Sequence, residues 1–260
     1  MELGLKNKTA LVLGASRGLG AAIARGLADE GVTVHAAARN TSAISTWVSE
    51  LAPTAGPVIP LQLDLSDIDS VNKAVQSLMA ARGVDILVNN SGGPPPAAAV
   101  DAKRSDWINH FETMAANIFH LTTTLLPGMR EKRWGRIISI ASSGVEQPIA
   151  RLALSNGIRS ALIGWSKTLA AEVAADGVTV NMLLPGRIHT HQVDELDAAA
   201  ASRSAKSVEE IAAESAAGIP AGRYGRPEEF AAVAVFLASE PASYVTGSKI
   251  RVDGGAIRSV

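Results

Sequence analysis

Short runs of β-forming residues alternate along the chain with longer alanine-rich segments, and this alternation is the strongest constraint on the fold. Strands are predicted at residues 9–13, 32–38, 58–65, 85–89, 136–142, 178–184 and 249–252. Helices are predicted at residues 18–30, 67–82 with Asp67 as the N-cap, 105–131, 153–175 and 227–238. Strands separated by helices pair in parallel through right-handed crossovers, and nearly continuous apolar strands indicate a sheet covered on both faces. The sequence therefore predicts one doubly wound α/β domain over residues 1–260, with about seven parallel strands.

The composition excludes several classes of function. A formal net charge of -1 gives no basis for a nucleic-acid or anionic-membrane partner. The chain has no cysteine, and its histidines lack the spacing of metal ligands, so neither disulfides nor a metal site is predicted. The N-terminus lacks the apolar core of a signal peptide, and the apolar runs are too short to span a membrane. We therefore expect a cytoplasmic protein whose partner is a small molecule.

A glycine-rich turn follows the first predicted strand and precedes the first predicted helix. Glycine permits a tight turn and the close approach of a pyrophosphate, and the N-terminus of the following helix offers free N–H groups. A structural turn without a ligand is the alternative for such a motif taken alone. The position between strand and helix favours dinucleotide binding of the Rossmann type. The residues expected to contact the cofactor here are Gly14, Ser16, Arg17, Gly18, Leu19 and Gly20.

The end of the second predicted strand indicates which dinucleotide is bound. NAD-binding folds tend to place an acidic residue there, which binds the ribose hydroxyls. In this chain the segment 36–40 reads AAARN and has no carboxylate. Arg39 and Arg17 can instead flank a 2′-phosphate, because a guanidinium matches phosphate geometry. The sequence therefore predicts NADP(H) as the preferred cofactor, with NAD(H) possible, unless both arginines are simply solvated surface charges.

Further motifs follow in a recognisable order. They are Asp64 in LDLSD, the run Asn89-Asn90-Ser91-Gly92, Pro185-Gly186 with Thr190, and RYGRPEEF at the start of a long C-terminal match. Together with the glycine turn, they make residues 5–255 resemble the short-chain dehydrogenase/reductase family, in its 3-oxoacyl-carrier-protein-reductase-like branch. Taken singly, the polar residues are also typical of turns at strand ends. The resemblance implies a nicotinamide-dependent oxidoreductase whose further cofactor contacts are Asp64, Leu65, Asn90, Ser91, Gly92, Pro185, Gly186 and Ile188.

The family's usual catalytic set is Asn, Ser, Tyr and Lys, and the resemblance places most of it on other residue types. The serine position is Ser142, whereas the tyrosine and lysine positions hold Ser155 and Arg159 and the asparagine position holds Met114. An aliphatic hydroxyl is a much weaker acid than a phenol, whose pKa is about 10, and a guanidinium stays charged. Ser142, Ser155 and Arg159 are the expected catalytic residues, and Arg159 is also expected to bind the cofactor ribose.

A substitute proton donor can be sought at the mouth of the cleft. His189 and His191 follow the sixth predicted strand, and histidine titrates near neutrality. Glu146 lies in the loop after the fifth strand. Arg187 is a candidate for binding a substrate carboxylate or phosphate. Solvated surface positions are the alternative for all four side chains. Tyr224 and Tyr244 are not expected to replace the missing tyrosine, because both lie in the C-terminal segment that matches the structural pattern of the family.

Three functions stay open on the sequence alone. The first is an NADP(H)-dependent oxidoreductase that acts on a carbonyl or alcohol with a non-standard proton donor. The others are a non-catalytic nicotinamide-binding protein, acting as a sensor or partner subunit, and a non-redox enzyme that uses Ser155 and Arg159 for elimination or isomerisation. The alanine- and serine-rich segment 191–218 predicts a mobile helical lid over the substrate. The resemblance, with the apolar face of 154–174, implies a homotetramer.

Overall fold

Seven parallel strands form the centre of the computed structural model, which describes residues 2–259. Their order across the sheet is β3-β2-β1-β4-β5-β6-β7, and every neighbouring pair is parallel. The strands are β1 (Thr9–Leu13), β2 (Thr33–Ala38), β3 (Val58–Gln62), β4 (Ile86–Asn89), β5 (Gly135–Ile140), β6 (Val178–Pro185) and β7 (Lys249–Val252). The predicted doubly wound, Rossmann-type α/β fold is confirmed.

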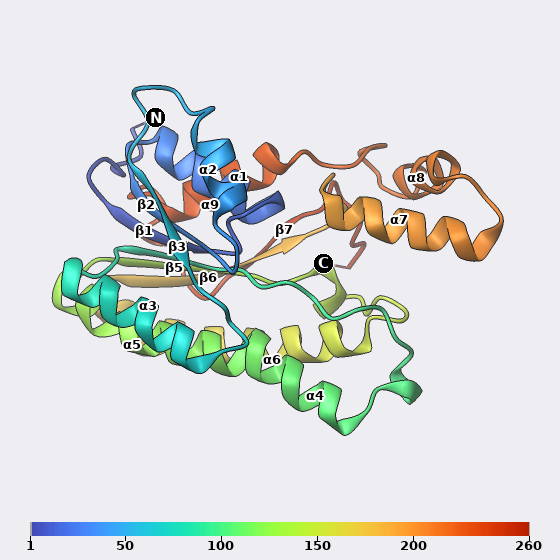
Figure 1. Ribbon diagram of the computed structural model, residues 1–260, viewed down its shortest axis with the longest axis horizontal. Helices are drawn as coiled ribbons and strands as arrows, with labels where there is room; N and C mark the ends of the chain where they lie inside the picture. Colours follow the sequence, from blue (N-terminus) through green and yellow to red (C-terminus); the bar gives the residue numbers. More distant parts are fainter. Residues whose placement is uncertain (1, 260) are drawn as a thin grey trace.

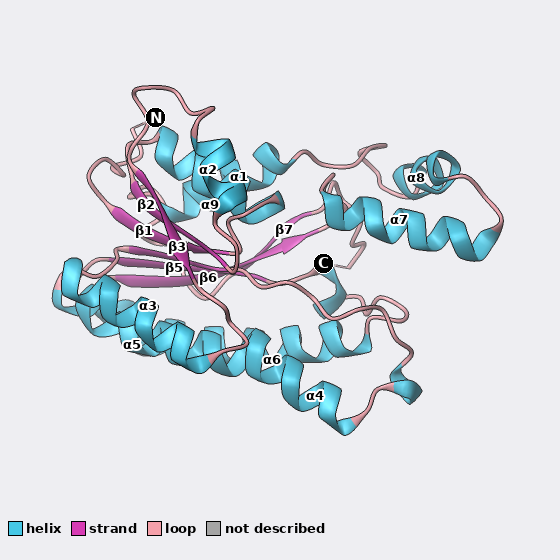
Figure 2. Cartoon of the chain, viewed as in Figure 1, coloured by secondary structure: helices cyan, strands magenta, loops and turns pink. Residues whose placement is uncertain are grey.

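Helices cover both faces of the sheet, as Figures 1 and 2 show. They are α1 (Gly18–Asp29), α2 (Ser42–Val48), α3 (Ile68–Ala81), α4 (Arg104–Phe111), α5 (Asn117–Glu131), α6 (Ala153–Val173), α7 (His191–Ser204), α8 (Val208–Ala217) and α9 (Pro227–Ala238). One buried cluster joins the sheet to α1, α2 and α9, and a second joins it to α3, α5 and α6. Burial on both faces explains why the strand sequences are apolar almost without interruption.

Two helical features differ from the predicted elements. The helix expected at 105–131 is divided by a π-turn, Glu112–Ala116, between α4 and α5. Helix α2 was not predicted, and it is held by Trp47, whose buried indole Nε1 donates a hydrogen bond of 3.1 Å to the carbonyl of Ala15. Asp67 is the N-cap of α3 as predicted, since its side chain accepts from the amide of Asp69.

The strand order places a crevice at one edge of the sheet. β2 lies on one side of β1 and β4 on the other, so the order reverses between β1 and β4. Ligands of open α/β sheets bind at such a switch point, outside the carboxyl ends of the strands. Residues 191–218 form α7 and α8, which project beyond the sheet in Figure 1. Of the helices described, none combines the length and the apolar character needed to cross a membrane.

Candidate active site

The glycine turn after β1 is closed tightly against β4. Gly14 and Gly18 have φ values of +64° and +60°, which favour glycine. A Cβ on Gly20 would lie 2.3 Å from the carbonyl oxygen of Gly14. Asn90, just after β4, donates from Nδ2 to the carbonyl of Leu13 at 3.2 Å. Among the described residues, no side chain caps the first turn of α1, which leaves its free N–H groups available to a ligand.

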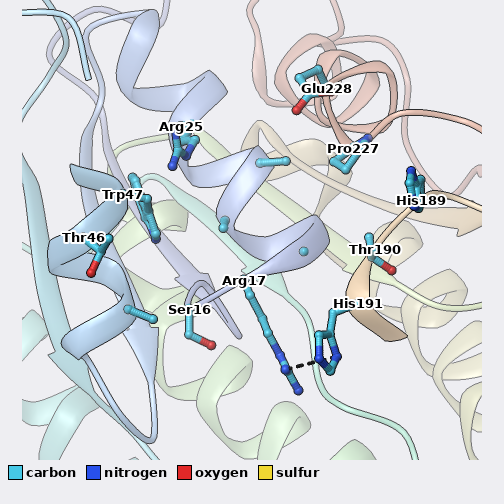
Figure 3. Close-up of a pocket in the computed structure, with 14 residues that line it drawn as sticks. Ser16, Arg17, Arg25, Thr46, Trp47, His189, Thr190, His191, Pro227 and Glu228 are labelled. Carbon is cyan, nitrogen blue, oxygen red and sulfur yellow. Dashed lines mark hydrogen bonds between the residues drawn. The ribbon is translucent and has the colours of Figure 1, made fainter. Parts of the chain in front are cut away.

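A hollow of about 600 Å³ opens beside this turn, between α1, α2 and the starts of α7 and α9, as Figure 3 shows. Arg17 reaches to 3.3 Å from Nδ1 of His191 (Figure 3). Both loop histidines are exposed, and each lies near a carboxylate of α7. His189 is 3.3 Å from Asp194, and His191 is 3.1 Å from Glu195. The histidines therefore gather at the outer side of the glycine turn, together with Arg17.

The far end of the crevice carries Asp64 and Arg39. The Asp64 carboxylate accepts hydrogen bonds from the amide and hydroxyl of Ser66, at 2.9 and 2.7 Å. These bonds, with a smaller contribution from the charge of Arg39, lower the pKa of Asp64. The next residue, Leu65, is held by its backbone carbonyl, which accepts a hydrogen bond of 2.8 Å from Nδ2 of Asn117. The Asn117 side chain is thus used in a structural hydrogen bond. The exposed Arg39 lies close enough to Asp64 for its charge to act on that carboxylate.

Arg159 is buried at the other end of the crevice, with 8% of its surface exposed. Its Nη1 donates to the carbonyl of Ile140 at 2.8 Å, and its Nη2 donates to the carbonyl of Ser91 at 3.0 Å. The guanidinium therefore joins the end of β5 to the segment after β4. Burial lowers the pKa of Arg159 to about 10, and no ion pair found among residues 2–259 involves it. At neutral pH it is a buried cation held by two backbone carbonyls.

Ser142 and Ser155 lie close to Arg159 in the local structure, since Ser142 comes two residues after Ile140, whose carbonyl Arg159 binds, and Ser155 belongs to the same helix. Ser142 follows β5, and its Oγ accepts a 3.1 Å hydrogen bond from the amide of Gly144, which leaves its own proton free to donate. Ser155 is half-buried and lies one helical turn before Arg159 on α6. Met114, in the π-turn, is 2% exposed and packs in an apolar cluster beneath this end of the site. The structure thus gathers Ser142, Ser155 and Arg159 at the ends of β4 and β5, while Met114 fills space.

Asn156 is a polar side chain of this region that the sequence reasoning missed. Its Nδ2 donates to the carbonyl of Ile149 at 2.9 Å. Its Oδ1 is buried and has no hydrogen-bond partner within residues 2–259, and it would lie 2.4 Å from a Cβ on Gly144. Nothing in the local sequence marks this residue, because an asparagine inside a helix pattern normally faces solvent.

A third wall comes from the segment after β6. The amide of Gly186 donates to the carbonyl of Val252 at 3.0 Å, which ties the Pro185-Gly186 turn to β7. Ile188 is buried and bridges to Gly225. Thr190 lies against Gly18, whose added Cβ would be 3.7 Å from the threonine methyl group. The segment therefore crosses from the end of β6 back to the glycine turn.

Two candidate acid and anion-binding side chains already have partners. Glu146 pairs with Lys249 at 3.0 Å and with Arg251 at 3.6 Å, both on β7. Arg187 pairs with Asp197 of α7, whose other oxygen accepts a 2.8 Å hydrogen bond from Tyr224. We call Arg187, Asp197 and Tyr224 the α7 latch. These pairings disfavour Glu146 as a free acid and Arg187 as a free anion contact.

The electrostatics of the latch centre on Asp197, which is 2% exposed. Burial, more than the other contacts of its hydroxyl, raises the pKa of Tyr224, so its phenol stays protonated and donates to Asp197.

In the part of the chain that the structure describes, no group of three or more His, Asp or Glu side chains is arranged to hold a metal ion.

Comparison with known proteins places this geometry in a family. The family profile described as Enoyl-(Acyl carrier protein) reductase matches residues 14–256. The 3-oxoacyl-(acyl-carrier-protein) reductase FabG of Vibrio cholerae is 37% identical over 253 residues, which cover 97% of this chain and 98% of that protein. The FabG of Escherichia coli K12 is 35% identical over 254 residues, with the same coverage.

Solved structures agree in fold. L-sorbose reductase from Gluconobacter frateurii, in complex with NADPH and L-sorbose, has a TM-score of 0.93 and 32% identity, and the match covers 100% of both chains. YwfH, an NADPH-dependent reductase involved in bacilysin biosynthesis, has a TM-score of 0.91 and 31% identity, over 98% of this chain and 100% of YwfH. Because both the family profile and these identities extend over nearly the whole chain, the protein belongs to the short-chain dehydrogenase/reductase family, in its FabG-like branch.

Proposed function

We propose that this protein is an NADP(H)-dependent oxidoreductase that acts on a carbonyl or alcohol substrate with a non-standard catalytic set. The observation that carries the proposal is the placement of Arg159, a buried cation between the ends of β4 and β5 at the switch-point crevice. NAD(P)H use by relatives supports the redox chemistry, since the similar L-sorbose reductase and YwfH are described with NADPH.

The cofactor would be held along the crevice. The N–H groups of the glycine turn suit its pyrophosphate, and Arg39 with Arg17 suits a 2′-phosphate. Asp64 and Leu65 would border the adenine, while Asn90, Ser91 and Gly92 would line the cleft. Pro185, Gly186 and Ile188 would border the nicotinamide. When bound, the reduced cofactor supplies a hydride, and the protein positions and polarises the substrate.

The residues of the chain would act on the substrate oxygen. Ser142 has a free hydroxyl proton, so it can donate a hydrogen bond to that oxygen. Arg159 would bind the cofactor ribose and stabilise developing negative charge, an electrostatic role that needs no proton transfer. We propose that Ser155, Arg159 and Met114 stand where the family has its Tyr, Lys and Asn. General acid–base assistance, worth about 10² to 10⁴-fold, would then have to come from elsewhere.

The test compares the native protein with the variant Met114→Asn/Ser155→Tyr/Arg159→Lys. NADPH absorbance is followed with a panel of ketones, aldehydes, enones and acyl thioesters. Oxidation of NADPH by the native protein supports the proposal. If only the restored variant oxidises NADPH, the crevice is intact but the native chemistry is different. A second candidate, a non-catalytic nicotinamide-binding protein, would then be favoured, since three substitutions at one site motivate it.

Two further proposals concern assembly and the segment 191–218. We propose a homotetramer, and a monomer mass in light scattering at working concentration would refute it. We also propose that α7 and α8 act as a lid over the substrate. Two contacts tie this segment to the body of the protein: Thr190, just before it, lies against Gly18 of the glycine turn, and Asp197 within α7 accepts a hydrogen bond from Tyr224.

A further inference from the structure

A second cavity, of about 280 Å³, lies between the middle of α6, the strand β6 and the start of β7. Within residues 2–259, its lining has no residue in common with the hollow beside the glycine turn or with the expected cofactor contacts. Its apolar wall consists of Ile163, Val180 and Met182. At about 30 Å³ for each non-hydrogen atom, the volume of one water molecule in the liquid, it has room for roughly nine such atoms. The cavity is therefore a separate candidate site for a small molecule.

The hydroxyl of Ser166 lacks a partner on the wall of this cavity. The residue is 3% exposed, and its Oγ is buried without a hydrogen bond to any group of residues 2–259. A serine inside a helix commonly donates to the carbonyl four residues earlier, as Ser160 does to Asn156 at 2.7 Å. A buried hydroxyl without a partner is unfavourable, because it has lost its hydrogen bonds to water. An acceptor atom of a bound molecule would restore such a bond, so Ser166 points to a ligand that carries an acceptor.

Two exposed lysines line the same cavity, one from α6 and one from β7. Nζ of Lys167 donates to the carbonyl of Gly247 at 3.0 Å, which fixes the ammonium beside the loop before β7 and leaves two of its three N–H donors. No ion pair of the described residues involves Lys167. Lys249 pairs with Glu146 at 3.0 Å, but Arg251 shares that carboxylate at 3.6 Å. Positive charge exceeds negative charge among these groups, which favours an anion.

The lining favours a carboxylate with an alkyl chain over other occupants. A phosphate is typically held by arginine forks or by a helix N-terminus, and no described residue of either kind lines this cavity. The described lining also has no aromatic ring on which a flat ligand would stack. Lysine is depleted in the buried centres of protein–protein interfaces, so this lining is unlike a subunit contact. The flexible side chain of Met182 adapts readily to an alkyl chain.

We propose that this cavity binds a carboxylate with a straight alkyl chain of about six to eight carbons. The carboxylate accepts hydrogen bonds from Nζ of Lys167 and from Oγ of Ser166, which are consecutive residues of α6. It has about four lone-pair positions, so it can accept both bonds. The alkyl chain packs against Ile163, Val180 and Met182. Binding is non-covalent and needs no cofactor, so this inference and the proposed oxidoreductase function can fail separately.

The dependence of affinity on chain length tests the apolar wall. Calorimetry measures the binding of butanoate, hexanoate, octanoate, decanoate and dodecanoate to the whole chain without cofactor. The dissociation constant should fall about fourfold for each added methylene, and should level off at about eight carbons because the cavity is then full. Octanol, which lacks the charge, should bind at least about fivefold more weakly than octanoate. A steady gain in affinity through dodecanoate, equal binding of octanol, or no binding of octanoate at millimolar concentration overturns the inference.

A charge variant tests the position of the carboxylate. Lys167→Met keeps the apolar stem and removes the ammonium, and should weaken octanoate binding by about 3- to 10-fold, a loss limited by the exposure of this side chain. Lys73→Met, at an exposed lysine of α3, is the matched control and should bind octanoate as the native protein does. Native affinity in Lys167→Met, or an equal loss in both variants, would contradict the proposed contact.

Two further variants separate a ligand contact from a structural role. Ser166→Ala removes a buried hydroxyl that has no partner in residues 2–259, so its Tm should be unchanged or higher, whereas its affinity for octanoate should fall by about 3- to 10-fold. Ile163→Trp fills the cavity from a half-buried position and should abolish octanoate binding. Octanoate binding of native strength in either folded variant would refute the site. If neither variant folds, Lys167→Met decides the question, because its side chain is exposed.

Discussion

Replacement of Gly20 by alanine should separate close packing of the glycine turn from ordinary helix propensity. In an open helical position, alanine is more stable than glycine by about 0.5–1 kcal/mol. At Gly20 the new Cβ would lie 2.3 Å from the carbonyl oxygen of Gly14 and 3.0 Å from Nδ2 of Asn90. Gly14 has little room to move away, since a Cβ built on it would lie only 2.6 Å from Nδ2 of Asn90. The two backbones must therefore separate.

The expected magnitudes follow from this crowding. Overpacking costs about 1–3 kcal/mol, which outweighs the gain in helix propensity. The net loss is on the order of 1–2 kcal/mol, or a fall in Tm of about 2–8 °C for a chain of this size. A shifted turn also misaligns the N–H groups of α1. The loss of one hydrogen bond to a phosphate should weaken NADPH binding by about 10- to 100-fold.

Calorimetry and an NADPH fluorescence titration measure the two effects. Gly128→Ala is the control, because Gly128 lies in α5 and its added Cβ would meet nothing within 4 Å. That variant should melt slightly higher than the native protein and bind NADPH with unchanged affinity. Native affinity together with a native or higher Tm in Gly20→Ala would refute the packing argument.

Three other perturbations test separate parts of the structure. Asp197→Ala removes the partner of Arg187 and Tyr224, and should lower the free energy of unfolding by about 1–3 kcal/mol, after allowance for the partly exposed arginine. It should also speed hydrogen exchange in α7, and unchanged exchange there would count against the latch. Burial lowers the pKa of His35, so below about pH 6.5 the unfolded chain binds a proton that the folded chain does not. Stability should then fall as the pH falls through this range, and urea midpoints of His35→Gln should lose that dependence. Arg39→Asp should weaken NADPH binding by about 10- to 100-fold and NADH binding much less; equal losses for both cofactors would argue that Arg39 does not face the 2′-phosphate.

Most of the fold could be predicted because its strands are buried on both faces. β1 and β7 have the predicted bounds, and the other strands differ by a few residues at their ends. Helix α2 could not be predicted, since its sequence SAISTWV has no amphipathic pattern and its stability depends on burial of Trp47. The π-turn at Glu112–Ala116 was missed for another reason. A change in hydrogen-bond register inside a continuous helical pattern leaves no mark on the sequence.

The candidate site was predictable where it depends on spacing and not where it depends on tertiary partners. The family resemblance, applied through its spacing, assigned Ser142, Ser155 and Arg159. The structure brings these residues to one end of the crevice, and their roles stay predictions. Glu146 pairs with a residue of β7, and Arg187 pairs with a residue of α7. Because these partners lie on other elements, the sequence does not reveal whether either charge is free or paired. Burial of Arg159 without a carboxylate is likewise a property of the assembled fold.

The latch has a consequence for the speed of exchange. Asp197 anchors α7 through two partners before any ligand is present, so α7 loses little conformational entropy when a ligand arrives. In the lid role that we propose for it, α7 must also be released each time a molecule enters or leaves. We therefore expect ligands to bind slowly and to dissociate slowly, with little change in the dissociation constant. The turnover rate should then be set by release of the product.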